Sequence, residues 1–95
     1  MKNPCVYMMA NKEHGTLYVG VTSNLPLRVA QHKAKTYPGF TAEYGLDLLV
    51  WYKIQGTMEA AIQREKQIKK YARAWKTRLI AVANPEWLDL AGELG

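Results

Sequence analysis

Two short apolar runs separated by a polar turn open the chain and predict a β-hairpin. Residues 5–10 read Cys-Val-Tyr-Met-Met-Ala, and residues 17–22 read Leu-Tyr-Val-Gly-Val-Thr, a run rich in β-branched and aromatic side chains. The polar segment between them contains Gly15, which is typical of a hairpin connection. Tyr7 and Tyr18 fall near the middle of the two strands, and a directly opposed pair would place both phenols on one face of the sheet.

Asn24 begins a predicted helix over about residues 24–35. Its side chain can cap the helix, and Pro26 in the first turn needs no intrahelical hydrogen-bond donor. Residues 37–45 contain proline and glycine and are expected to form a loop. The apolar segment 46–55 that follows is expected to form a third strand.

Two further helices are expected after the third strand. Thr57 is a good N-cap, and the lack of Gly and Pro after it predicts a helix of four to five turns to about Arg73. A helix over 75–83 should end at Asn84, because the residue before a proline disfavours the helical conformation. A short helical turn over 87–94 completes the order β-β-α-β-α-α, so we expect a mixed α+β fold in which helices cover an antiparallel sheet.

The composition is that of an ordinary folded domain. Of 95 residues, 48% are hydrophobic and 22% are charged, so we expect one globular domain over residues 1–95. No apolar run approaches the roughly 18 residues that a membrane span needs. Cys5 has no second cysteine with which to form an internal disulfide or a zinc cluster. With no signal-peptide pattern at the start, this predicts a reducing, cytoplasmic setting.

The positive charge is concentrated in one segment. The chain has 13 Lys and Arg against 8 Asp and Glu, a net charge of +5, and residues 64–78 contain a block of basic side chains with Glu65 as its one acid. The block residues expected to contact nucleic acid are Arg64, Lys66, Lys69, Lys70, Arg73 and Lys76. A solvated helix face with no ligand explains the same pattern. A nucleic-acid partner is therefore one of two interpretations of the charge.

Glu65 interrupts the apolar stripe of the helix predicted after Thr57. Projected at about 100° per residue, the stripe consists of Met58, Ala61, Ile62, Ile68 and Ala72. Burying an unpaired carboxylate costs several kcal/mol. Glu65 must therefore pair with a cation, accept hydrogen bonds or line a cleft, and a structural glutamate paired with arginine satisfies this as well as a functional one.

Arg28 and His32 interrupt the apolar face of the first helix in the same way. They alternate with Leu25 and Val29 at spacings that place all four side chains on one face. Alone, an arginine with a snorkelling stem or a hydrogen-bonded histidine would be ordinary. Two such residues on a face that should meet the sheet favour a site there.

Taken in order, these positions resemble the GIY-YIG nuclease superfamily, in particular its small stand-alone bacterial members. The resemblance covers the chain from Val6 to about Trp87 and implies a three-stranded antiparallel sheet flanked by helices. The residues that carry it are Cys5-Val6-Tyr7, Tyr18-Val19-Gly20, Thr22, Arg28, His32, Glu65 and Asn84.

The resemblance implies a role for each matched tyrosine and glycine. Tyr7 corresponds to the tyrosine of the first half-motif. Tyr18 and Gly20 correspond to the second half-motif, in which Val19 replaces isoleucine. Cys5 departs from the family pattern because it stands in place of the leading glycine.

The other matched positions carry the charged groups of the site. Arg28 corresponds to the arginine near the scissile phosphate, and His32 to a frequently catalytic position one turn later. Glu65 corresponds to the single metal-binding carboxylate. Thr22 and Asn84 are expected to support the site.

These roles predict a metal-dependent DNA endonuclease that acts in DNA repair or processing. Phosphodiester hydrolysis needs an activated water, stabilisation of charge on the phosphate and help for the leaving oxygen. Mg²⁺ or Mn²⁺ on Glu65 and the charge of Arg28 would stabilise the transition state. Tyr7 or Tyr18 would activate the water, and His32 would assist proton transfer.

Other functions remain open. A nucleic-acid-binding module could keep the fold without turnover, and Trp51, Trp75 and Trp87 could serve a protein interface, although tryptophans are more typical of a core. RNA is an alternative substrate, although the sequence shows no aromatic platform for single strands. Because 95 residues leave no room for a targeting domain, targeting would come from the catalytic face, a partner protein or a homo-oligomer.

Overall fold

The structure is a computed structural model that describes residues 3–35 and 44–94. Three strands and four helical segments are present in this part of the chain. They are β1 (Cys5–Ala10), β2 (Leu17–Thr22), α1 (Leu25–Ala34), β3 (Leu48–Ile54), α3 (Met58–Lys69), α4 (Arg73–Ala83) and the 3-10 helix η1 (Leu90–Leu94). The expected α+β class and the order β-β-α-β-α-α are confirmed. Most of the predicted 37–45 loop lies outside the described residues.

The three strands form one antiparallel sheet with β1 in the centre. The strand order is β2-β1-β3, and all six residues of β1 are fully buried. Both the hairpin and the third strand were predicted by the apolar runs. One irregularity of the sheet was not predicted. Met8 pairs with Trp51 and Met9 pairs with Leu49, which leaves Val50 as an extra residue in β3.

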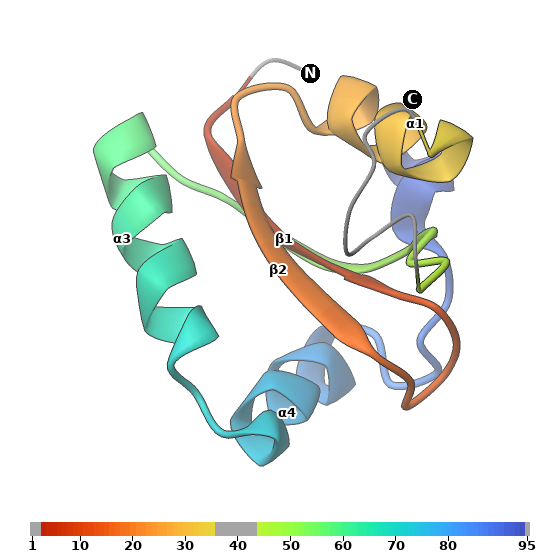
Figure 1. Ribbon diagram of the computed structural model, residues 1–95. Coiled ribbons are helices and arrows are strands. Elements are labelled where there is room, and N and C mark those ends of the chain that lie inside the picture. Colours follow the sequence, from red (N-terminus) through yellow and green to blue (C-terminus); the bar gives the residue numbers. More distant parts are fainter. Residues whose placement is uncertain (1–2, 36–43, 95) are drawn as a thin grey trace.

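Helices cover both faces of the sheet. In Figure 1, α3 and α4 lie on one side of the β1–β2 hairpin, and α1 lies on the other. The core under α3 and α4 consists of Val6, Met8, Ala10, Val19, Val50, Trp51, Ile68, Ile80 and Trp87. The core under α1 and η1 consists of Cys5, Tyr7, Met9, Leu25, Val29, Leu46 and Leu49. The alternation of side chains along β1 thus separates Tyr7 from the α3 and α4 face.

Local capping signals correctly predicted where α1 and α3 begin. The Asn24 side chain accepts a hydrogen bond from the backbone N–H of Leu27, and the Thr57 hydroxyl accepts one from Ala60. Lys35 ends α1 in the left-handed conformation at φ 55°. The site residues on α1 are therefore held on a helix with both ends defined.

The predicted helix to Arg73 is wrong at its C-terminal end. α3 stops at Lys69, and Arg73 begins α4 instead, with Ala72 in an extended conformation as its N-cap. Tyr71 lies in the break and packs against the core under α4. Packing of this side chain supplies a physical reason for the break, which no Gly or Pro marks in the sequence.

Two side chains assigned to the apolar stripe are consequently not on it. Ala72 is exposed at the start of α4, and Ile62 is 38% exposed. Ala61 and Ile68 are the buried residues of α3. The helix therefore packs on a narrower stripe than predicted, with Glu65 between its two buried residues.

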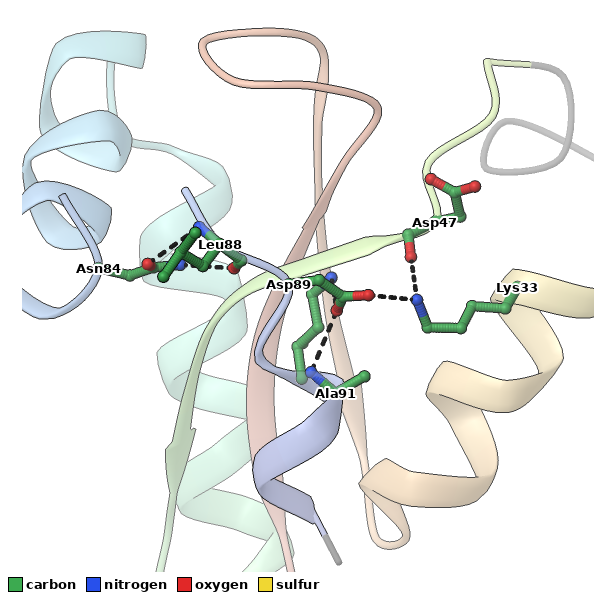
Figure 2. Close-up of polar contacts among 7 residues, drawn as sticks. Lys33, Asp47, Asn84, Leu88, Asp89 and Ala91 are labelled. Atoms are coloured by element: carbon green, nitrogen blue, oxygen red, sulfur yellow. Dashed lines mark hydrogen bonds and ion pairs between the residues drawn. The ribbon is translucent and has the colours of Figure 1, made fainter. Parts of the chain in front are cut away.

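The segment after α4 is fastened to the sheet by polar contacts (Figure 2). The Asn84 amide donates to the carbonyl of Val50 at 3.0 Å. It also donates to the carbonyl of Leu88 at 2.8 Å, and its oxygen accepts from the N–H of Leu88. Asp89 accepts hydrogen bonds from the Leu49 N–H and the Lys33 ammonium. These bonds place η1 against β3 and α1.

The tryptophans divide between the core and the surface. Trp51 and Trp87 are buried as expected, with 7% and 4% of their surface exposed. Trp75 is 58% exposed, so its assignment to the core is wrong. Among the described residues, no helix is long and apolar enough to cross a membrane.

Candidate active site

Tyr7 lies over Gly20, its direct partner in the hairpin. Tyr18 pairs with Met9 instead, so the two tyrosines are diagonal neighbours and not a directly opposed pair. Both still lie on the α1 face, with ring centroids 6.3 Å apart. A Cβ atom on Gly20 would stand 2.5 Å from both Cζ and Oη of Tyr7. The glycine therefore makes room for the phenol.

His32 joins the two tyrosines from α1. The Tyr7 hydroxyl lies 2.9 Å from Nε2 of His32, and the His32 ring centroid is 5.7 Å from each tyrosine ring. His32 is only 8% exposed. The structure thus brings together three of the predicted catalytic residues from three elements.

Burial and neighbouring charges set the protonation states of this cluster. Burial raises the pKa of Tyr7 well above its ordinary value, nearby Tyr18 and Glu65 add to this, and Arg28 offsets it only in part through its charge and a hydrogen bond. Burial and then the positive charge of Arg28 lower the pKa of His32. At neutral pH the pair is therefore a protonated phenol beside a neutral imidazole.

Arg28 lies one helical turn before His32 and acts on both members of the pair. Its charge lowers the pKa of Tyr7 and of His32, which places the guanidinium close to both groups. It is half-buried. A fixed positive charge therefore lies beside the phenol and the imidazole, as the face of the helix predicted.

Glu65 reaches the same cluster from α3. Its side chain is only 15% exposed, and its Oε2 lies 3.5 Å from the ammonium of Lys69, one turn later. The Lys69 ammonium also lies 6.0 Å from the centre of the Tyr18 ring. Glu65 is thus paired with a lysine one turn later on the same helix.

Lys69 is the residue of this cluster that the sequence interpretation missed. The sequence predicts it only as part of a nucleic-acid-binding surface with the rest of the basic block. Its spacing of four residues from Glu65 was the available signal, since such pairs meet on a helix.

Cys5 is accommodated where the family has glycine. The side chain is fully buried in the core under α1, and burial raises the pKa of its thiol to about 11. The group is consequently a neutral, apolar filler at physiological pH.

Thr22 and Asn84 differ in their relation to the site. The Thr22 hydroxyl accepts a hydrogen bond from the N–H of Asn24 at 3.1 Å and so shapes the turn that leads into α1. The described contacts of Asn84 go to β3 and to Leu88 on the other side of the molecule. Asn84 therefore anchors the C-terminal segment.

The basic block is divided among several tasks. Arg64 donates to the side chains of Gln67 and Tyr71, and Arg73 donates to the carbonyls of His14 and Gly15. The bonds of Arg73 tie α4 to the turn of the hairpin.

The lysines of the block differ in exposure. Lys66 and Lys70 are exposed, whereas Lys76 is half-buried. The first two are therefore open to solvent on α3 and at its end.

The side chains near Tyr7 that could bind a metal ion favour a hard, hydrated cation. Among the described residues, no three His, Cys, Asp or Glu side chains gather as a metal site. Glu65 is the carboxylate nearest to Tyr7 in the cluster. One carboxylate suits a hard cation that keeps most of its waters, such as Mg²⁺ or Mn²⁺, and does not suit structural zinc.

A small antiparallel sheet with a Tyr–His–Arg–Glu cluster across its hairpin defines a GIY-YIG type of domain. The sequence model of the GIY-YIG catalytic domain matches residues 3–78. The chain therefore belongs to the GIY-YIG family.

The chain is also similar to UPF0213 proteins over most of its length. The chain is 38% identical over 76 residues to a UPF0213 protein of Natronomonas pharaonis, which covers 80% of this chain and 88% of that protein. It is 36% identical over 72 residues to a UPF0213 protein of Syntrophus aciditrophicus, covering 75% and 82%. A UPF0213 protein of Bacillus halodurans, solved by solution NMR, shares the fold with a TM-score of 0.55 at 24% identity, over 90% of this chain and 92% of that one.

Proposed function

We propose that this protein is a metal-dependent endonuclease that hydrolyses phosphodiester bonds in DNA. The observation that carries the proposal is the hydrogen bond of 2.9 Å between Tyr7 and His32, with the charge of Arg28 beside both groups and Glu65 near Tyr7. Membership of the GIY-YIG family supports a nuclease-like function. A role in DNA repair or processing, and a cytoplasmic setting, remain predictions.

The Tyr7–His32 pair can take the proton of the attacking water. Because the pKa of Tyr7 is raised, a standing phenolate is disfavoured at neutral pH. Neutral His32 can instead accept the Tyr7 proton on Nε2 while the Tyr7 oxygen accepts a proton from water. The water oxygen then bonds to phosphorus, the bond to the 3′-oxygen breaks, and that oxygen takes a proton from solvent.

Arg28 and Glu65 would manage the charge of the reaction. A guanidinium stabilises negative charge that develops on the phosphate oxygens, and Arg28 lies beside the pair that handles the proton. Glu65 would hold Mg²⁺ or Mn²⁺, which when bound supplies Lewis-acid stabilisation to the phosphate and the leaving oxygen. Lys69 compensates the same carboxylate at 3.5 Å, so metal and ammonium compete for it.

The test is nicking of supercoiled plasmid by purified protein with Mg²⁺ or Mn²⁺ and with EDTA. Glu65→Gln should reduce the rate by roughly 100-fold or more, since the metal site is lost. Glu59→Gln is the matched control because Glu59 lies in the first turn of the same helix and is exposed. Equal rates for wild type and Glu65→Gln would exclude the assignment. A shift in DNA mobility without nicking would indicate the non-catalytic alternative.

A further inference from the structure

A groove of about 600 Å³ lies on the α4 side of the sheet, along the outer strand β3. Its described lining combines three aromatic and three cationic side chains from β3, α3, α4 and the break between the two helices. These are Trp51, Lys53, Arg64, Tyr71, Trp75 and Arg78. None of the described residues that line it is acidic. The groove thus favours a ligand that is both aromatic and negatively charged.

The groove is separate from the candidate active site. Tyr7 packs under α1, where it contacts His32 of that helix, whereas Trp51 and Tyr71 pack with the core on the opposite face of the sheet. α3 links the two regions, because the neighbouring residues Arg64 and Glu65 serve one each. A ligand could therefore contact both regions by passing around this helix.

Two arginines are held against aromatic rings on the groove wall. The Arg78 guanidinium lies 5.7 Å from the centre of the Trp75 ring, and the Arg64 guanidinium lies 5.9 Å from the centre of the Tyr71 ring. Arg64 also donates to the Tyr71 hydroxyl at 3.1 Å. Arginine keeps its charge in such pairs and presents several donors in a fixed plane, which suits phosphate.

Trp75 is the exposed member of this set. More than half of its surface, 58%, is open to solvent, although burial of an indole normally stabilises a folded protein. An exposed tryptophan beside cations in a groove is typical of proteins that stack unpaired bases while they contact the backbone.

We propose that this groove binds an unpaired stretch of the nucleic-acid substrate, with a base stacked on Trp75 and phosphates contacted by Arg64 and Arg78. Unpaired nucleotides are the occupant that fits, because each one offers a free aromatic face and a negatively charged phosphate. Base-paired nucleotides in a duplex keep both faces stacked. An acidic peptide would satisfy the cations without a base for the indole.

The proposal rests on the proposed nuclease function and narrows its substrate. A chain that occupies both regions would be cut beside an unpaired segment, as found at a branch, gap or single-stranded tail. The catalytic residues and the groove can nevertheless be tested separately, because binding to the groove needs neither metal nor cleavage.

The experiment measures binding of a labelled oligothymidylate, about 15 nucleotides long, by fluorescence anisotropy in EDTA. Trp75→Ala should weaken binding roughly tenfold, whereas Trp75→Phe should retain most of the affinity because the stacking face is kept. Leu88→Ala is the matched control, since Leu88 is also 58% exposed and does not line the groove. Circular dichroism checks that each variant is folded.

The outcomes separate the two proposals. Wild-type affinity in Trp75→Ala would overturn the groove assignment, whatever the plasmid assay shows. Binding of a polyglutamate peptide that depends on Trp75, without Trp75-dependent binding of oligothymidylate, would assign the groove to an acidic protein partner and also overturn it. A third outcome is that Trp75→Ala loses oligothymidylate binding while the wild-type protein does not nick plasmid. This would support the groove assignment and count only against the proposed nuclease activity.

Discussion

Gly20 leaves the space that the Tyr7 phenol occupies on β2. Because a Cβ atom would stand 2.5 Å from Cζ and Oη of Tyr7, Gly20→Ala must displace the ring. We expect a loss of about 1–3 kcal/mol in the free energy of unfolding and a large loss of nicking activity, since the bond from Tyr7 to His32 is disturbed.

Gly56→Ala provides the control for this substitution. Gly56 is exposed, and a Cβ atom there would meet no other atom within 4 Å. Thermal unfolding and plasmid nicking should be close to wild type in this variant. A Gly20→Ala protein with unchanged melting and activity would show that the close packing of Tyr7 on β2 is not required.

The pH dependence of cleavage can distinguish two roles for Tyr7. It could pass a proton to neutral His32 during the reaction, or it could act as a phenolate that is ionised beforehand. The pKa of His32 lies below its ordinary value, so its neutral form, which accepts the Tyr7 proton, is already present at neutral pH. The rate at saturating metal should therefore rise as pH increases through the acidic range and stay level from about pH 7 to 9. A rate that keeps rising toward pH 10 would mean that Tyr7 must ionise first.

Individual site residues could be predicted where a charged or polar side chain occurs on an apolar face of a predicted helix. Arg28, His32 and Glu65 each stand on an apolar face, and the structure brings all three near Tyr7. The pairing of Lys69 with Glu65 was missed because nothing distinguishes this lysine from the other cations of the basic block. The contact between Gly20 and the Tyr7 ring could not be predicted, because it depends on the register of the hairpin, which the sequence does not specify.

Among the elements, those with local signals were predicted and those shaped by tertiary packing were not. The hairpin follows from its two apolar runs, and α1 follows from the Asn24 cap. The break between α3 and α4 has no Gly or Pro, and it coincides with packing of Tyr71 on the core. The extra residue Val50 in β3 likewise depends on its pairing with β1. The groove beside Trp75 was missed because it is assembled by these two irregular features.

The segment after α4 gives a prediction at the level of elements. Asn84 is 4% exposed and makes three hydrogen bonds, to Val50 and Leu88. Asn84→Ala leaves these backbone groups without a partner, so we expect a loss of about 2–3 kcal/mol in the free energy of unfolding. Urea unfolding measures this, and Asn3→Ala at an exposed position is the control.

Activity below the unfolding transition separates anchoring from a role at the site. If Asn84 only anchors the segment, folded Asn84→Ala protein should nick plasmid at nearly the wild-type rate. A stable but inactive Asn84→Ala protein would place the amide in the reaction and restore the assignment expected from the family.

Charge is distributed unevenly over the whole molecule. Asp89 and Glu93 of the acidic C-terminal segment are engaged by Lys33 and the Tyr52 hydroxyl on the α1 and η1 side. The exposed lysines Lys66 and Lys70 lie on α3 and at its end, on the other side of the sheet. The net charge of +5 is therefore less informative than the location of its cations.

Salt dependence can show whether location or total charge determines DNA binding. A double variant with Lys66→Gln and Lys70→Gln should reduce the slope of log affinity for duplex DNA against log salt by about 2, if each lysine contacts one phosphate. The control carries Lys12→Gln and Lys35→Gln, two exposed lysines in the hairpin turn and after α1. Both double variants lower the net charge equally, and only the first should change the slope. Equal changes would mean that α3 is not a preferred DNA contact, because binding would then follow the net charge of the protein.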